Sequence, residues 1–97
     1  MALSKKQIRH LKALAHNKNP VVTIGNNGVS AAVIEEITTA LAHHELIKIK
    51  LPGVDKAGRQ ALADQVCGQS QANFVAMIGR VLVIFLASSD TKIQFPS

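Results

Sequence analysis

The most informative absence in this sequence is that of acidic residues from its first third. Residues 1–34 contain five lysines and arginines but no aspartate or glutamate, whereas residues 35–97 contain six basic and six acidic residues. The formal net charge of +5 therefore comes entirely from the N-terminal third. A one-sided basic surface attracts a polyanion, either nucleic acid or, less often, an anionic membrane. Our candidate phosphate contacts in this segment are Lys5, Arg9, Lys12 and Lys18.

Cysteines, aromatic residues and long apolar runs are also scarce. The single cysteine, Cys67, excludes an internal disulfide framework and fits a reducing compartment, so we expect a cytoplasmic protein. No apolar run approaches the roughly 20 residues of a membrane-spanning helix, and the N-terminus lacks the pattern of a secretory signal. Tryptophan and tyrosine are absent, so aromatic platforms for stacking bases are poorly supplied. Phe74 and Phe85 lie in apolar segments and are expected in the core.

The length of 97 residues predicts one domain, 1–97, with a polar tail at 88–97 whose order the sequence leaves open. Ser4 and Gln7 form a capping-box pattern that predicts the start of a first helix. Apolar residues recur behind it at helical spacing. The cations of this helix fall in one stripe away from the apolar face, namely Lys5, Arg9, Lys12 and His16.

Further elements follow in the order β-α-β-α-β-β, so the whole chain is expected to run α-β-α-β-α-β-β. The expected strands are 21–24, 46–51, 72–79 and 81–87, and the expected helices begin after Ser30 and Asp55. Gly79-Arg80 fits a type II′ hairpin, which favours glycine first. Two successive βαβ units favour mostly parallel pairing, with one antiparallel strand added by the hairpin. The predicted class is α/β (α+β), two-layer, with a four-stranded mixed sheet.

A glycine-rich loop, Gly25-Asn26-Asn27-Gly28, lies between the first strand and the second helix. Its backbone N–H groups and the following helix N-terminus would favour an anion. The sequence matches neither GxGxxG nor a P-loop, although RNA-binding KH domains clamp nucleotide backbone with a similar GxxG loop. The alternative is a plain turn that needs positive φ. The acid-free segment beside the loop favours contact with a nucleic-acid backbone.

No set of residues forms an expected active site or metal site. His43 and His44 are adjacent and diverge on a helix, and the second histidine of a zinc-protease motif is missing. We expect His44 at a helix end or core edge. Cys67 has no patterned partner, so we expect no enzyme activity, no metal and no cofactor.

Four stretches make the chain resemble the YhbY family, the stand-alone bacterial form of the CRM (chloroplast RNA splicing and ribosome maturation) domain. They are LSKKQIRHLKALAH at 3–16, PVVTIGNNGVS at 20–30, EEITTALAHHELIKIKL at 35–51 and VAMIGRVLVIF at 75–85. The resemblance implies a fold like the C-terminal domain of translation initiation factor 3 with an extra N-terminal helix. It also implies RNA binding and association with precursors of the large ribosomal subunit.

The family's functional positions map onto this chain through those stretches. Its GxxG loop corresponds to 25–28, its basic helix positions to Lys5, Arg9 and Lys12, and its glycine-basic hairpin to Gly79 and Arg80. Relatives often carry a basic residue after the last strand, where this chain has Leu86-Ala87-Ser88.

The leading hypothesis is a monomeric, non-enzymatic RNA-binding protein of ribosome assembly, without a small-molecule substrate or membrane partner. In the expected strand 46–51, Ile47, Ile49 and Leu51 point to a buried face, and Lys48 and Lys50 alternate with them on a solvated face. The alternative is a protein-interaction module that presents Lys48 and Lys50, or the first helix, to an acidic partner. An enzyme acting on a phosphorylated small molecule at the glycine loop is a third possibility, and it lacks a positioned acid, base or metal ligand.

Overall fold

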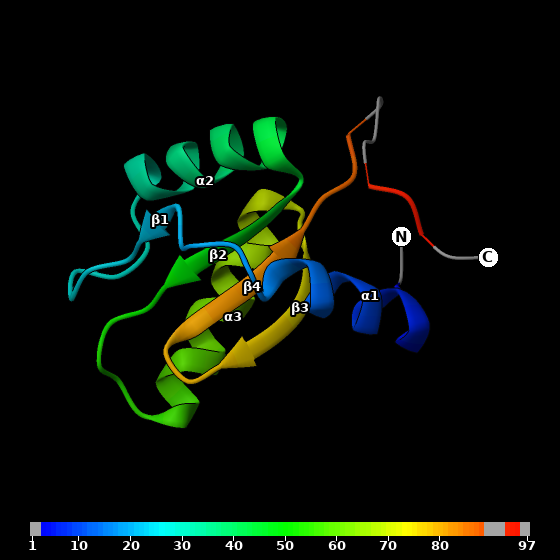
Figure 1. The fold of residues 1–97 in the computed structure, drawn as a ribbon. Coiled ribbons are helices and arrows are strands. Elements are labelled where there is room, and N and C mark those ends of the chain that lie inside the picture. Colours follow the sequence, from blue (N-terminus) through cyan, green and yellow to red (C-terminus); the bar gives the residue numbers. More distant parts are fainter. Residues whose placement is uncertain (1–2, 89–92, 96–97) are drawn as a thin grey trace.

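The computed structural model describes residues 3–88 and 93–95 (Figure 1). It contains three helices and four strands in the predicted order. They are α1 (Lys5–Ala15), β1 (Val22–Thr23), α2 (Ala31–His44), β2 (Leu46–Lys50), α3 (Lys56–Ser70), β3 (Asn73–Ile78) and β4 (Val81–Phe85).

Each helix begins at a side chain that satisfies its free backbone N–H groups. The capping box of α1 is confirmed, because the Ser4 hydroxyl accepts from the Gln7 N–H and the Gln7 side chain accepts from the Ser4 N–H. Ser30 caps α2 by accepting from the N–H of residue 33 at 3.1 Å. Asp55 caps α3 by accepting from the Gly58 N–H at 2.7 Å.

The four strands form one mixed sheet in the order β1-β2-β4-β3. Only β1 and β2 pair in parallel, and both other pairs are antiparallel, so the expectation of mostly parallel pairing was wrong. Strand β4 folds back from β3 and inserts beside β2. Its residues 82–85 are all buried, which suits a central strand, whereas Phe74 and Ile78 of β3 are exposed at the sheet edge.

The two faces of the sheet carry separate hydrophobic clusters. Helices α2 and α3 cover one face, where Ile37 and Val66 pack against alternate residues of β2 and β4. Helix α1 lies across part of the opposite face, where Leu11 and Ala15 pack against Leu46 and other strand residues. Figure 1 shows α1 in front of the sheet and α3 behind it. The sheet with α2 and α3 makes the two expected layers, and α1 is the added helix.

Two local expectations need correction, and a third is confirmed in one of its two alternatives. Phe74 is 42% exposed and not a core residue, because it lies on the edge strand. Strand β2 does not have one fully solvated face, because α1 buries Leu46 and half-buries Lys48. His44 ends α2 as expected but is exposed, not packed at the core edge.

Part of the C-terminal tail, which was expected to be polar, makes apolar contacts with the rest of the protein. Ile93 and Phe95 are half-buried and pack against the cluster under α1. Residues 89–92 and 96–97, which belong to the predicted tail, lie outside the described residues. None of the helices in the described residues has the length and apolar character needed to cross a membrane.

Candidate nucleic-acid interface

The glycine loop is a tight turn with two exposed asparagines at its tip. The Gly28 N–H donates to the Gly25 carbonyl at 3.1 Å, which closes the turn around Asn26 and Asn27. Both asparagine side chains are exposed. The loop therefore presents amide groups and backbone to solvent directly after β1.

The backbone conformation requires glycine at only one of the two glycine positions in this loop. Gly28 has φ +78°, a conformation that residues with a Cβ rarely adopt. Gly25 has no positive φ, and a Cβ built on it would meet no atom within 4 Å. The plain-turn interpretation thus explains Gly28 and leaves Gly25 unexplained. A glycine that the chain itself does not require is consistent with close approach of an external molecule.

Lys50 and Arg80 lie at the same end of the sheet as this loop. The Ile24 N–H, directly before the loop, donates to the Lys50 carbonyl at 2.8 Å. The Leu51 N–H donates to the Arg80 carbonyl at 2.7 Å, and Arg80 Nε donates to the Leu51 carbonyl at 3.3 Å. Arg80 is exposed but held against this segment by its Nε contact. Gly79 has φ +60° and Arg80 has no positive φ, as a type II′ turn requires.

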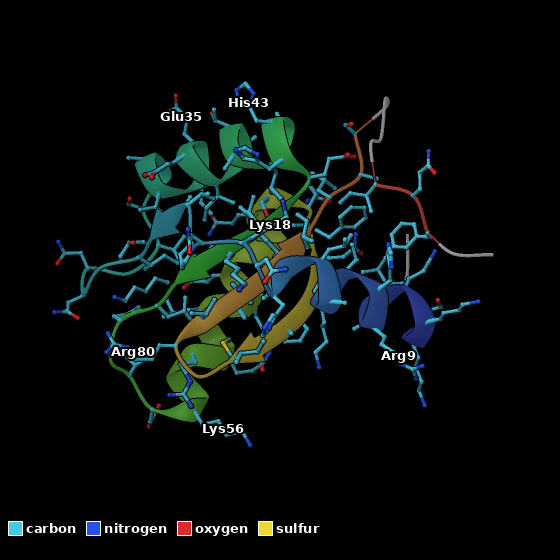
Figure 2. The ribbon with its side chains drawn as sticks, in the orientation of Figure 1. Arg9, Lys18, Glu35, His43, Lys56 and Arg80 are labelled. Carbon is cyan, nitrogen blue, oxygen red and sulfur yellow. The ribbon has the colours of Figure 1, made fainter. Side chains whose placement is uncertain are left out.

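The basic stripe of α1 faces solvent along the sheet. Lys5, Arg9 and Lys12 are all exposed, as predicted. Figure 2 shows Arg9 and Arg80 toward opposite ends of the molecule, whose longest dimension is 40 Å. A ligand that touched both would therefore have to be a long polyanion.

The C-terminal end of α1 meets the sheet at Lys48. Lys48 Nζ donates to the His16 carbonyl at 3.5 Å, where the helix leaves its last carbonyls without partners. Such a contact is favourable because the C-terminus of a helix carries partial negative charge. Lys12, His16 and Lys48 are thereby gathered at one place on the sheet face.

Lys18 is not part of this group. It lies in a groove with His10 of α1 and His43 and His44 of α2, and Figure 2 labels it between these helices. The structure thus brings Lys12 together with Lys48, and Lys18 together with histidines on the other flank.

The described acidic residues lie away from the basic stripe. Glu35 and Glu36 are exposed on α2, Asp64 lies on α3, and Asp55 is the residue that caps α3. Glu45 is buried, and its carboxylate accepts from the Ser88 N–H at 2.7 Å. The acids of the described chain thus belong to α2, α3 and the residues that flank them, whereas the sheet face beside α1 carries lysines.

Histidines and the cysteine do not form a reactive site. Among residues 3–88 and 93–95, no three His, Cys, Asp or Glu side chains come together as metal ligands. Burial, reinforced by the nearby Asp64 carboxylate, raises the pKa of the Cys67 thiol. A raised pKa leaves the sulfur protonated at neutral pH, which is the opposite of an activated nucleophile.

Lys48 and Lys50 were missed as candidate nucleic-acid contacts. The sequence assigned them to a possible protein-binding face, because the order of the strands was not known. Their alternation with isoleucines did show that they share one face of β2. That this is the face carrying α1 could be seen only in the folded chain.

Comparison with known proteins identifies similar chains. The family model for the CRS1/YhbY (CRM) domain matches residues 3–85. The chain is 45% identical over 94 residues to a protein of Haemophilus influenzae named "RNA-binding protein", with 97% of this chain and 95% of that one covered. It is 30% identical to the Bacillus subtilis protein named "Probable RNA-binding protein YqeI", with 97% and 99% covered.

A solved structure has the same fold. The solution structure of a hypothetical protein from Staphylococcus aureus superimposes with a TM-score of 0.85 at 30% identity. The match covers 98% of this chain and 100% of the other.

Proposed function

Because this chain belongs to the CRS1/YhbY (CRM) domain family, we propose that it binds ribosomal RNA in precursors of the large ribosomal subunit. It would act there in ribosome assembly, as a cytoplasmic monomer without catalytic activity. The names of its relatives support RNA as the ligand. The ribosomal role follows from the resemblance of the four stretches quoted above.

The observation that carries the proposal is the series of basic residues, without a described acid among them, from α1 to the end of the sheet beside the glycine loop. Lys5, Arg9 and Lys12 line its helix, and Lys50 and Arg80 lie at its far end beside the loop. No described acid lies on α1 or on the sheet strands that form this face. Phosphates repeated along a strand match such an extended row of cations better than a small anion does.

The glycine loop would contact the RNA backbone. At Gly25 and Gly28 the absence of side chains lets a phosphate approach the main chain, and Asn26 and Asn27 can donate amide hydrogens. The N-terminus of α2 follows closely and adds a favourable dipole. Lys18 would neutralise a separate phosphate on the other flank of α1.

The dependence of RNA affinity on salt tests the electrostatic part of this mechanism. If about five phosphates are neutralised, the logarithm of the binding constant should fall with the logarithm of salt concentration at a slope of roughly −3.5 to −4.5. The measurement is a titration of a ribosomal RNA fragment by fluorescence anisotropy at several potassium chloride concentrations. A slope near zero would contradict the proposed contacts.

The cellular ligand is tested by sedimentation. Lysate is separated on a sucrose gradient with and without ribonuclease, and the fractions are probed for this protein. We expect it to migrate with precursors of the large subunit and to leave those fractions after nuclease treatment. A complex that survives nuclease would instead indicate a protein partner.

A further inference from the structure

A pocket of about 540 Å³ opens on the basic face, beside the C-terminal end of α1. Its apolar side consists of Ile78, Val81 and Val83 from the β3–β4 hairpin. Two lysines, Lys12 and Lys48, and the His16 ring also line the pocket. This volume is within the range of about 300–1,000 Å³ that is usual for small-ligand sites.

The pocket exists because α1 is shorter than the sheet face that it covers. The helix ends at Ala15, and no described helix covers the strand residues beyond it. Lys50, Val81 and Ile78 are cross-strand neighbours in that uncovered row. Ile78 is consequently 58% exposed, the largest exposure among the big apolar side chains of the described chain.

The composition of the pocket selects its ligand. An exposed apolar floor favours a flat, weakly polar group, and the lysines at its rim favour negative charge beside that group. The pocket between β1 and α2 differs, because Glu35 and Glu36 line it and would repel phosphate. A nucleotide combines a flat base with an adjacent phosphate.

We propose that this pocket receives one unstacked base of a single-stranded RNA segment, with the flanking phosphates on Lys12 and Lys48. The inference rests on the proposed RNA-binding function and adds the form of RNA that is bound. The base would lie against the Val81 and Ile78 methyl groups, and His16, which also lines the pocket, would supply a ring on which it could stack. The scarcity of aromatic residues does not prevent this contact, because aliphatic side chains supply the floor.

A base inside a duplex cannot enter this pocket, since it is stacked on both faces and paired at its edge. The protein should therefore prefer single-stranded RNA over duplex RNA of equal length and at equal salt. Lysines alone would not produce this preference, because a duplex has the higher charge density.

Binding of two RNA probes tests the proposal. We would measure the affinity of a ten-nucleotide oligoadenylate and of a ten-base-pair RNA duplex for the wild-type protein and for Ile78→Thr. Because the floor loses apolar contact with the base, we expect about fivefold weaker oligoadenylate binding and less than a twofold change for the duplex. The matched control is Val21→Thr, which changes a 47% exposed β-branched residue outside this pocket.

These measurements distinguish a failure of the base-binding proposal from a failure of the RNA-binding proposal. Equal losses of oligoadenylate affinity in Ile78→Thr and Val21→Thr would contradict base binding in the pocket. Tighter binding of the duplex than of oligoadenylate by the wild type would contradict it as well. Neither result would contradict RNA binding in general. A wild type that binds neither probe would overturn the proposed function and this inference with it. Thermal unfolding by circular dichroism verifies that both variants are folded.

Titration with adenosine monophosphate locates the site directly. We expect the methyl resonances of Ile78, Val81 and Val83 to shift in the NMR spectrum. Inorganic phosphate at the same concentration should leave these methyl signals in place, because it lacks the base. Shifts of the same size with both compounds, or shifts confined to methyl groups elsewhere, would contradict the assignment.

Discussion

The ring of Phe95 meets the ring of Phe85 edge-on, with centroids 5.9 Å apart and planes at 89°. Phe85 is the last residue of β4, an inner strand of the sheet, and is 1% exposed, whereas Phe95 belongs to the C-terminal segment. The other side of Phe95 lies near His10 of α1, at 5.7 Å between ring centroids. This segment therefore helps to hold α1 on the sheet, and with it the basic face.

We expect Phe95→Ala to lower the free energy of unfolding by about 1–3 kcal/mol, because it removes an edge-to-face aromatic pair and partly buried apolar area. Chemical denaturation with urea provides the measurement. The control is Phe74→Ala, which truncates a 42% exposed ring at the sheet edge and should have a smaller effect. A Phe95 variant no less stable than the Phe74 variant would show that the tail does not support α1.

Gly25→Ala should weaken RNA binding and leave stability almost unchanged. The added methyl group meets nothing within 4 Å inside the protein, so any effect must come from an external ligand. We expect about a fivefold loss of affinity, close to one hydrogen bond. The control is Gly68→Ala, at an equally open position in α3, which should gain about 0.5–1 kcal/mol of stability and keep its affinity. Unchanged affinity in Gly25→Ala would contradict loop contact.

Gly28→Ala is expected to destabilise the protein by about 1–2 kcal/mol, because an L-residue is strained at φ +78°. Its melting temperature should fall relative to Gly25→Ala under the same conditions. Loss of RNA binding in this variant alone would therefore not identify a contact. A variant as stable as the wild type would show that the loop adopts another backbone conformation in solution.

Lys50→Gln should reduce the salt dependence of RNA binding. If this exposed lysine neutralises one phosphate, the slope becomes shallower by about 0.7–0.9. Lys56→Gln removes the same charge from the first residue of α3, the helix that packs on the opposite face of the sheet from α1, and should leave the slope nearly unchanged. Equal slopes for the two variants would mean that only net charge, and no localised face, attracts RNA.

Cys67 should react slowly with iodoacetamide. Burial and the Asp64 carboxylate raise its pKa, so the alkylation rate of the folded protein should rise at higher pH than that of the unfolded chain in urea. The folded state holds the thiol proton more tightly than the unfolded chain does. The free energy of unfolding should therefore fall as pH rises above the thiol's ordinary pKa of about 8.5. A folded-state midpoint below that of the unfolded chain would contradict this environment.

Local chemistry made much of the fold predictable. Ser4, Ser30 and Asp55 start their helices as their sequences indicated, and the Gly79-Arg80 hairpin forms where a glycine-first turn was expected. These features depend on contacts within a few residues. The order of the strands does not, and the inference from two βαβ units failed where β4 inserted between β2 and β3.

The sequence by itself determined the charge segregation, the helix starts, the glycine turn and the family, because each depends on residues that are close together in the chain. Only the tertiary structure decided that α1 lies across the sheet face opposite α2 and α3, and that it stops short of the row containing Lys50 and Ile78. That placement depends on burying Leu11 and Ala15 against residues more than thirty positions away. Packing over such distances places the basic helix, Lys48 and the open pocket on the same face of the sheet.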